Sequence, residues 1–185
     1  KNVASLGIGI LFDVLQSIRD NIKVTAENEI SEYKLLSIKV GKDTNLLIAA
    51  IYRSDSGTYH NNMNLLNLFK EINAMKQSHK VIVGDFNYKE IDWDTWYTPK
   101  NENSEEQLFI NCIQDIYWYQ HILTPIRHRE GDEPSTLDLV FTNEEEMIQS
   151  ISHQSPLGKS DHSVLLIKFI IQRKSKFTTE NENRQ

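Results

Sequence analysis

Cysteine is scarce in this chain of 185 residues, because Cys112 is the only one. A single cysteine excludes an internal disulfide framework and a zinc site built from several thiolates. Cys112 also falls in an apolar helical row, so we expect a buried structural thiol and not a nucleophile.

Long apolar runs are absent as well. No segment reaches the about 18 consecutive apolar residues that a membrane-spanning helix needs. The first residues lack the basic and then apolar layout of a signal peptide. We therefore expect an intracellular protein, nuclear or cytoplasmic, with no membrane partner.

The chain also lacks an excess of positive charge. Lysine and arginine number 20 against 26 aspartates and glutamates, which gives a formal net charge of −6. Binding of a polyanion by charge alone is therefore not expected. An enzyme site with a divalent cation fits better, because such a site needs acidic ligands and the ion itself supplies positive charge.

Apolar spacing predicts an α/β fold within one domain. We expect strands at 6–12, 21–25, 33–40, 46–52, 80–84, 121–124, 137–142, 147–153 and 164–171. Helices are expected at 61–78 and after Ser104, which has capping-box spacing to Gln107. Strands apolar on both faces indicate a layered sandwich of two mixed β-sheets flanked by helices. Residues 1–171 would form this domain and residues 172–185 a polar tail or linker.

One short stretch, residues 80–87, joins a buried strand to polar residues. Gly84 suits a tight turn or a closely approaching ligand. Asp85 and Asn87 are two positions apart, so both point to the same side of an extended backbone. Such a pair suits a water molecule and a phosphate oxygen. The alternative interpretation is an Asx-turn in which both side chains cap backbone groups.

Further polar residues stand inside or at the ends of apolar strands, namely Tyr52-Arg53, Asp138 and Asp161-His162. An aspartate inside a buried strand is unfavourable unless it is paired or hydrogen-bonded. His162 is the expected partner of Asp138, because a carboxylate fixes the imidazole tautomer and stabilises the charged ring. The alternatives are a satisfied structural carboxylate, a solvated histidine and a packed strand-end tyrosine.

These motifs, in this order, resemble the endonuclease/exonuclease/phosphatase superfamily. The closer resemblance is to the endonuclease domain of non-LTR retrotransposons, upstream of their reverse transcriptase. Residues 135–143 and 156–162 share it, and the resemblance covers residues 7–171. The motifs that carry it are Ile51-Tyr52-Arg53, Gly84-Asp85-Phe86-Asn87, Asp92-Trp93, Thr136-Leu137-Asp138 and Ser160-Asp161-His162.

The resemblance implies a deoxyribonuclease I-like fold and an endonuclease that hydrolyses DNA phosphodiester bonds for retrotransposon integration. In that reaction Asp85 would orient and deprotonate the attacking water, and Asn87 would hold that water or a phosphate oxygen. His162 would contact the scissile phosphate, steadied by Asp138. The chemistry is displacement at phosphorus, with charge stabilised by a metal and preorganised donors.

The resemblance also implies a Mg²⁺ site, with Mn²⁺ as the alternative ion, in which Asp161 is a ligand. Tyr52 would contact the phosphate, and Arg53 is a weaker candidate for the same contact. A reverse transcriptase domain of the same polyprotein is the implied protein partner, and DNA is the implied substrate.

Two further features bear on DNA contact. Arg127 and Arg129 favour nucleic acid weakly, because a solvated loop explains them equally well. Trp93 and Trp96 are suited to stacking on bases, but packing within the protein is the favoured interpretation.

The sequence departs from the family pattern at its start. The family begins with a strand, a helix and a strand that ends in a metal-binding glutamate, and none of these is visible before residue 7. Glu27, Glu29 and Glu32 fall in an expected linker, so none is predicted to replace that glutamate. We therefore expect a domain incomplete at its N-terminus, with impaired metal binding. A phosphatase or phosphodiesterase of small or lipid phosphates, and a non-catalytic remnant, are the competing functions.

Overall fold

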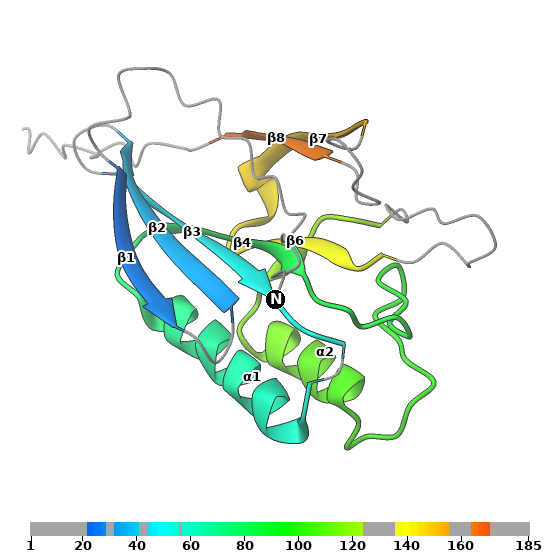
Figure 1. The fold of residues 1–185 in the computed structure, drawn as a ribbon. Coiled ribbons are helices and arrows are strands. Elements are labelled where there is room, and N and C mark those ends of the chain that lie inside the picture. Colours follow the sequence, from blue (N-terminus) through cyan, green and yellow to red (C-terminus); the bar gives the residue numbers. More distant parts are fainter. Residues whose placement is uncertain are drawn as a thin grey trace, which may run out of the picture.

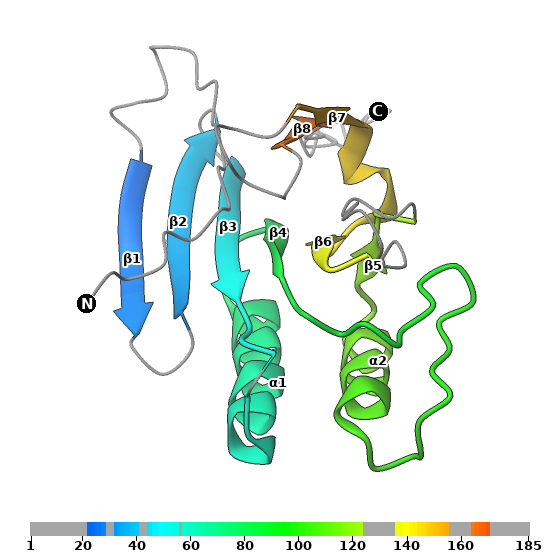
Figure 2. The ribbon, with the colours of Figure 1, turned by 45° about the vertical axis from the view of Figure 1, so that its right-hand side comes forward.

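The computed structural model describes residues 22–28, 32–40, 44–55, 57–123, 136–155 and 164–170. Within them, a six-stranded sheet carries two helices on one face and a two-stranded sheet on the other (Figure 1). The view in Figure 2 shows the same order of layers. This arrangement confirms the predicted layered α/β sandwich. The predicted strand at 6–12 and the tail at 172–185 lie outside the described residues.

The six-stranded sheet is mixed. β3 and β4 pair in parallel, and every other neighbouring pair of this sheet is antiparallel. β2 and β3 form a hairpin, with Val40 opposite Thr44. Across the sheet the strands are β1 (Ile22–Asn28), β2 (Glu32–Val40), β3 (Thr44–Tyr52), β4 (His79–Asp85), β6 (Asp138–Thr142) and β5 (Tyr119–Gln120).

Two helices cover one face of this sheet. α1 (Tyr59–Ala74) connects the parallel strands β3 and β4, and the side chain of Thr58 accepts a hydrogen bond from the backbone of Asn61 at its start. α2 (Glu105–Asp115) begins at Ser104, whose Oγ accepts from the Gln107 backbone N–H at 3.2 Å. Neither helix is long and apolar enough to cross a membrane, judged on the described residues.

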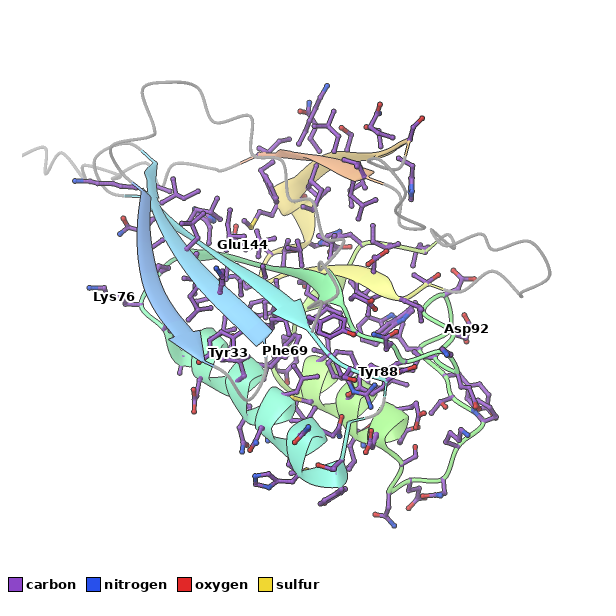
Figure 3. The ribbon with its side chains drawn as sticks, viewed as in Figure 1. Tyr33, Phe69, Lys76, Tyr88, Asp92 and Glu144 are labelled. Atoms are coloured by element: carbon purple, nitrogen blue, oxygen red, sulfur yellow. The ribbon has the colours of Figure 1, made fainter. Side chains whose placement is uncertain are left out.

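The core on the helix side is rich in aromatic rings. Phe69 of α1 contacts the rings of Phe86, Phe109 and Phe141, with ring centroids 5.4 to 5.8 Å apart. All four rings are fully buried, and Phe69 is labelled in Figure 3. Tilted and edge-to-face contacts of this kind add stability beyond the buried area. The helix layer therefore holds β3, β4 and β6 from one side.

The second core lies on the opposite face. Its buried members include Ile48, Val81, Val83 and Val140 from the central strands. Partly buried side chains of β7 (Ile148–Gln154) and β8 (Val164–Phe169), an antiparallel pair, pack against it. A short 3₁₀ turn, η2 (Glu145–Met147), leads into β7. The strands β3 and β4 are thus buried on both faces, as their apolar sequences predict.

Asn143 fixes the end of β4 that lies away from the polar residues. Its Oδ1 accepts from the Lys80 backbone N–H at 2.6 Å, and its Nδ2 donates to Ser78 O at 2.9 Å. Asn143 N–H also donates to Lys80 O at 3.3 Å. The register of β4 and β6 is therefore held by a side chain as well as by the ladder.

Some element boundaries differ from the sequence expectation. The predicted helix at 61–78 ends at Ala74, and the predicted strand at 121–124 is instead β5 at Tyr119–Gln120. The His121 backbone N–H still donates to Val140 O at 2.9 Å, which continues the pairing beyond β5 by one bond. Edge pairing of this length depends on the neighbouring strand more than on local propensity.

Candidate active site

Three neighbouring strands bring polar residues into one row. Tyr52 of β3 is the register partner of Asp85 of β4, and Asp85 is the register partner of Asp138 of β6. Residues directly opposite one another in a sheet project from the same face. The strand alternation assigns this face, because Val83 and Val140 lie two positions away in the core opposite the helices. The structure therefore brings together three of the predicted site residues, on the side of β7 and β8.

The strand register continues to a residue that the sequence predicts to lie in a linker. Glu32 is the first residue of β2 and the register partner of Tyr52. Glu27, in turn, lies in β1 opposite Lys34. Their assignment to a linker is therefore wrong, because the strand expected at 21–25 runs on to Asn28 and the strand expected at 33–40 begins at Glu32. Glu29 lies outside the described residues.

Gly84 sets how closely β3 approaches β4 beside the row. A Cβ atom at this position would lie 1.9 Å from Ile51 O and 2.9 Å from Ile51 C. Any side chain would therefore collide with the backbone of the neighbouring strand. Glycine is required here by the strand spacing, immediately before Asp85.

The segment after β4 turns sharply at Asn87. This residue has a φ of 51°, in the left-handed region that asparagine tolerates better than most residues. Its backbone N–H donates to Asp85 Oδ1 at 3.3 Å, and its Nδ2 donates to Arg53 O at 2.7 Å. The Asx-turn of the alternative interpretation is thus present. It is compatible with a catalytic role, because a carboxylate accepts several hydrogen bonds at once.

Arg53 is held inside the protein. Its backbone N–H donates to Asp85 O at 2.9 Å, and its Nη1 donates to Phe86 O at 3.3 Å. Nη2 forms an ion pair with Glu105 at the start of α2, and the Arg53 side chain is only 12% exposed. Its predicted contact with a substrate phosphate stays a prediction.

The tryptophan next to Asp92 belongs to the core. Trp93 is 3% exposed and lies edge-on to Phe109 and Phe141. Trp96 packs edge-on against Trp93, at 5.3 Å between centroids. The expectation of packing within the protein is therefore confirmed for Trp93.

Asp92, labelled in Figure 3, organises the loop after β4. Its Oδ2 accepts from Thr95 Oγ1 at 2.6 Å, and its Oδ1 accepts from the Asp94 backbone N–H at 3.0 Å. The Thr95 hydroxyl, followed by the Asp94 amide, lowers the pKa of Asp92. The backbone of Asp92 also pairs with Tyr97 in both directions.

Cys112 is a buried structural thiol, as expected. Its Sγ lies 3.7 Å from Leu66 O, and burial raises the pKa of the thiol to about 11. A thiol of this kind is a poor nucleophile near neutral pH.

Several predicted site residues cannot be placed. Asp161 and His162 precede β8, and Arg127 and Arg129 precede β6, but all four lie outside the described residues. Their roles stay predictions.

The chemistry of the row fits a hard cation. Asp85 and Asp138 are register partners, so both carboxylates project from the same face of the sheet. Carboxylate oxygens are the ligands that Mg²⁺ prefers. No group of three or more His, Cys, Asp or Glu side chains with metal-binding geometry occurs among the described residues. A complete ligand set would therefore need residues beyond those described.

The chain is similar to several solved structures. The endonuclease domain of TRAS1, a telomere-specific non-LTR retrotransposon, superposes with a TM-score of 0.60 at 15% identity, covering 84% of this chain and 71% of that domain. An endonuclease/exonuclease/phosphatase family protein from Leptotrichia buccalis gives a TM-score of 0.49 at 15% identity, covering 80% of this chain and 62% of its own. A protein of the same family from Bacteroides thetaiotaomicron gives 0.47 at 9% identity, with 82% and 64% covered.

The sequence itself also matches a known family. No curated protein matches the chain. Residues 46–166, however, match the family described as endonuclease-reverse transcriptase. This region contains Tyr52, Asp85 and Asp138 of the row, together with Asn87. The chain therefore belongs to the endonuclease-reverse transcriptase family of the endonuclease/exonuclease/phosphatase superfamily.

Proposed function

We propose that this chain is a divalent-metal-dependent endonuclease domain that hydrolyses phosphodiester bonds in DNA. The observation that carries the proposal is the row in which Tyr52, Asp85 and Asp138 are register partners on three neighbouring strands. Family membership supports the reaction class. The row supplies a candidate base and a candidate phosphate contact on one face of a rigid sheet.

In the proposed reaction, water attacks phosphorus in line with the leaving sugar oxygen, whose bond to phosphorus breaks and which takes up a proton from solvent. Asp85 accepts the proton of the attacking water, and Asn87 helps to orient that water. Tyr52 contacts a phosphate oxygen. His162 contacts the scissile phosphate and Asp138 steadies its ring, as the family resemblance implies.

The proposed cation is Mg²⁺ or Mn²⁺. When bound, it would stabilise the negative charge that develops on the phosphate oxygens. Asp161 is the ligand that the resemblance implies, and the oxygen-rich row fits such an ion. The acidic net charge of the chain is consistent with this requirement.

We further propose that the nick serves integration of a retrotransposon by target-primed reverse transcription. The name of the family supports a reverse transcriptase domain as a partner in the same polyprotein. The similarity to the TRAS1 domain supports the fold on which this proposal depends.

Nicking of supercoiled plasmid tests the reaction class. We expect Mg²⁺-dependent conversion to the open circle, stopped by a chelator, and reduced 10²- to 10⁴-fold by Asp85→Ala, roughly the effect of losing a positioned base. Asp94→Ala, at an exposed loop carboxylate, is the matched control and should behave as wild type. Unchanged nicking by a folded Asp85→Ala protein would remove Asp85 from the mechanism.

The same preparation separates the competing functions. Turnover of phosphate monoesters or of lipid phosphates without DNA nicking would favour a phosphatase or phosphodiesterase. Absence of Mg²⁺-dependent turnover of any phosphate ester would favour a non-catalytic remnant.

A further inference from the structure

One residue contacts all four members of the segment Asp85–Tyr88, which we call the site loop. Arg53 donates from its backbone to Asp85 O at 2.9 Å and from Nη1 to Phe86 O at 3.3 Å. Nη1 also lies 3.5 Å from Asn87 O, and Arg53 O accepts from Asn87 Nδ2 at 2.7 Å. The guanidinium carbon lies 4.1 Å from the centroid of the Tyr88 ring. The backbone and the side chain of Arg53 together contact the site loop along its whole length.

The guanidinium of Arg53 is also held by a residue of α2. Nη2 pairs with Glu105 Oε2, and Glu105 occupies the first turn of the helix that Ser104 caps. The side chains of Arg53 and Glu105 are 12% and 27% exposed. Removal of one partner from such a sheltered pair leaves an uncompensated charge, which is strongly unfavourable. Glu105 therefore fixes where the guanidinium can lie.

The end of the site loop is secured by the helices as well. Tyr88, labelled in Figure 3, stacks on Phe109 of α2 with 4.5 Å between ring centroids. Its hydroxyl donates to Asn62 Oδ1 of α1, and burial raises the pKa of Tyr88. The ring that Arg53 covers is thus itself fixed.

The site loop needs such support because of its backbone. Asn87 has a φ of 51°, which is higher in energy than the right-handed alternative. The bonds from Asn87 to Asp85 Oδ1 and to Arg53 O hold this conformation. A side chain displaced by about 1 Å can lower a catalytic rate by about 10²-fold.

We propose that Arg53 is a positioning residue. Locked to Glu105, it fixes the site loop and thereby orients Asp85 and Asn87 for phosphodiester hydrolysis, without contacting the substrate. The proposal rests on the proposed nuclease function. It assigns Arg53 a role different from the phosphate contact that its place beside Tyr52 suggests.

Glu105→Gln distinguishes the two roles, because they predict opposite effects. If Arg53 positions the loop, loss of the ion pair lowers kcat and leaves KM for DNA unchanged. If Arg53 binds phosphate, loss of the competing carboxylate frees the guanidinium, so KM falls and kcat is maintained. Glu106→Gln is the matched control, because it makes the same charge change in the same helical turn.

The experiment measures kcat and KM on a fluorescent DNA duplex with Mg²⁺. We expect Glu105→Gln and Arg53→Lys each to lower kcat about 10²-fold at constant KM. The double variant should be no worse than either single variant, because both changes break one unit. Glu106→Gln should match wild type. A lower KM with unchanged kcat in Glu105→Gln would overturn the proposal.

Amide hydrogen exchange tests the same idea without turnover. We expect Glu105→Gln to accelerate exchange at Phe86, Asn87 and Tyr88, while amides of β3 and β4 keep wild-type rates. Uniformly faster exchange, or none, would overturn the positioning role. If wild type does not nick DNA, the proposed function fails, and the exchange result alone decides whether Arg53 orders the loop.

Discussion

The carbonyl oxygen of Ile51 occupies the space that a Cβ atom at Gly84 would need. The separation would be 1.9 Å, and real Cβ contacts are essentially never shorter than 3.0 Å. Because the obstacle is backbone, only a shift of β3 or β4 could relieve the collision. The close spacing of β3 and β4 beside the row of polar residues therefore requires glycine at position 84, because only a hydrogen atom fits there.

We predict that Gly84→Ala destabilises the protein by at least about 1–3 kcal/mol, the usual effect of overpacking a core. The free energy of unfolding in urea measures this effect. Gly57→Ala is the control, because a Cβ atom there lies 3.2 Å from Ser54 O, and its effect should stay within about 1 kcal/mol. Equal unfolding free energies for the two variants would contradict the prediction.

The position of Glu32 beside Tyr52 gives a second prediction. We predict that Glu32→Gln weakens Mn²⁺ or Mg²⁺ binding roughly 10- to 100-fold, as loss of a supporting carboxylate does. Isothermal titration of the metal measures this without DNA. Glu27→Gln removes an equal charge from the edge strand β1 and should leave the affinity near wild type. Identical isotherms for all three proteins would exclude Glu32 from the site.

A third prediction concerns Asp138 and its expected partner. We predict that Asp138→Asn moves the NMR titration of His162 to lower pH, because a neighbouring carboxylate favours the imidazolium. Nicking should fall while the melting temperature stays close to wild type. Asp94→Asn, a change at an exposed carboxylate, should leave the titration unchanged. A His162 titration that is the same in Asp138→Asn would mean that the two residues do not interact.

The fourth prediction uses the raised pKa of Cys112, which burial brings from 9.0 to about 11. Since the folded pKa lies above the unfolded value, the thiol contributes stability that is fully present below pH 9.0. That contribution is lost as pH rises through about 11. We predict that the difference in unfolding free energy between wild type and Cys112→Ala shrinks over this interval. Other groups titrate equally in both proteins. A difference in unfolding free energy that stays constant with pH would therefore refute the raised pKa of Cys112.

Much of the fold follows from the spacing of apolar residues along the sequence. The apolar runs of β3 and β4 and the spacing of α1 predict two buried parallel strands joined by a crossover helix. Because the carboxyl ends of such strands meet at one edge, Tyr52 and Asp85 come together. Asp138 joins them because β6 pairs with β4 in the register that puts its first residue opposite Asp85.

The remaining features depend on long-range contacts that no local pattern reports. Glu27 follows the strand expected at 21–25 and looks like part of a linker, yet β1 runs on to Asn28 because β2 offers it an edge. The sequence shows Arg53 only as a residue after Tyr52 and before a polar loop, and so as a weaker candidate for a phosphate contact. Its burial results from Glu105, 52 residues away, and from carbonyls of the site loop. Asp161 and His162 stay predictions, because they lie outside the described residues.

The parallel pairing of β3 with β4 has a consequence for how the chain folds. The β2–β3 hairpin pairs two strands that follow each other directly in the sequence. Arg53 and Phe86, by contrast, are 33 positions apart, with all of α1 between them. Pairings across such a separation form slowly, because chain entropy is lost before any contact is gained. A refolding chain should therefore acquire the hairpin first and the row of polar residues late. During synthesis, the proposed active site would therefore be assembled only after β3 and β4 have paired.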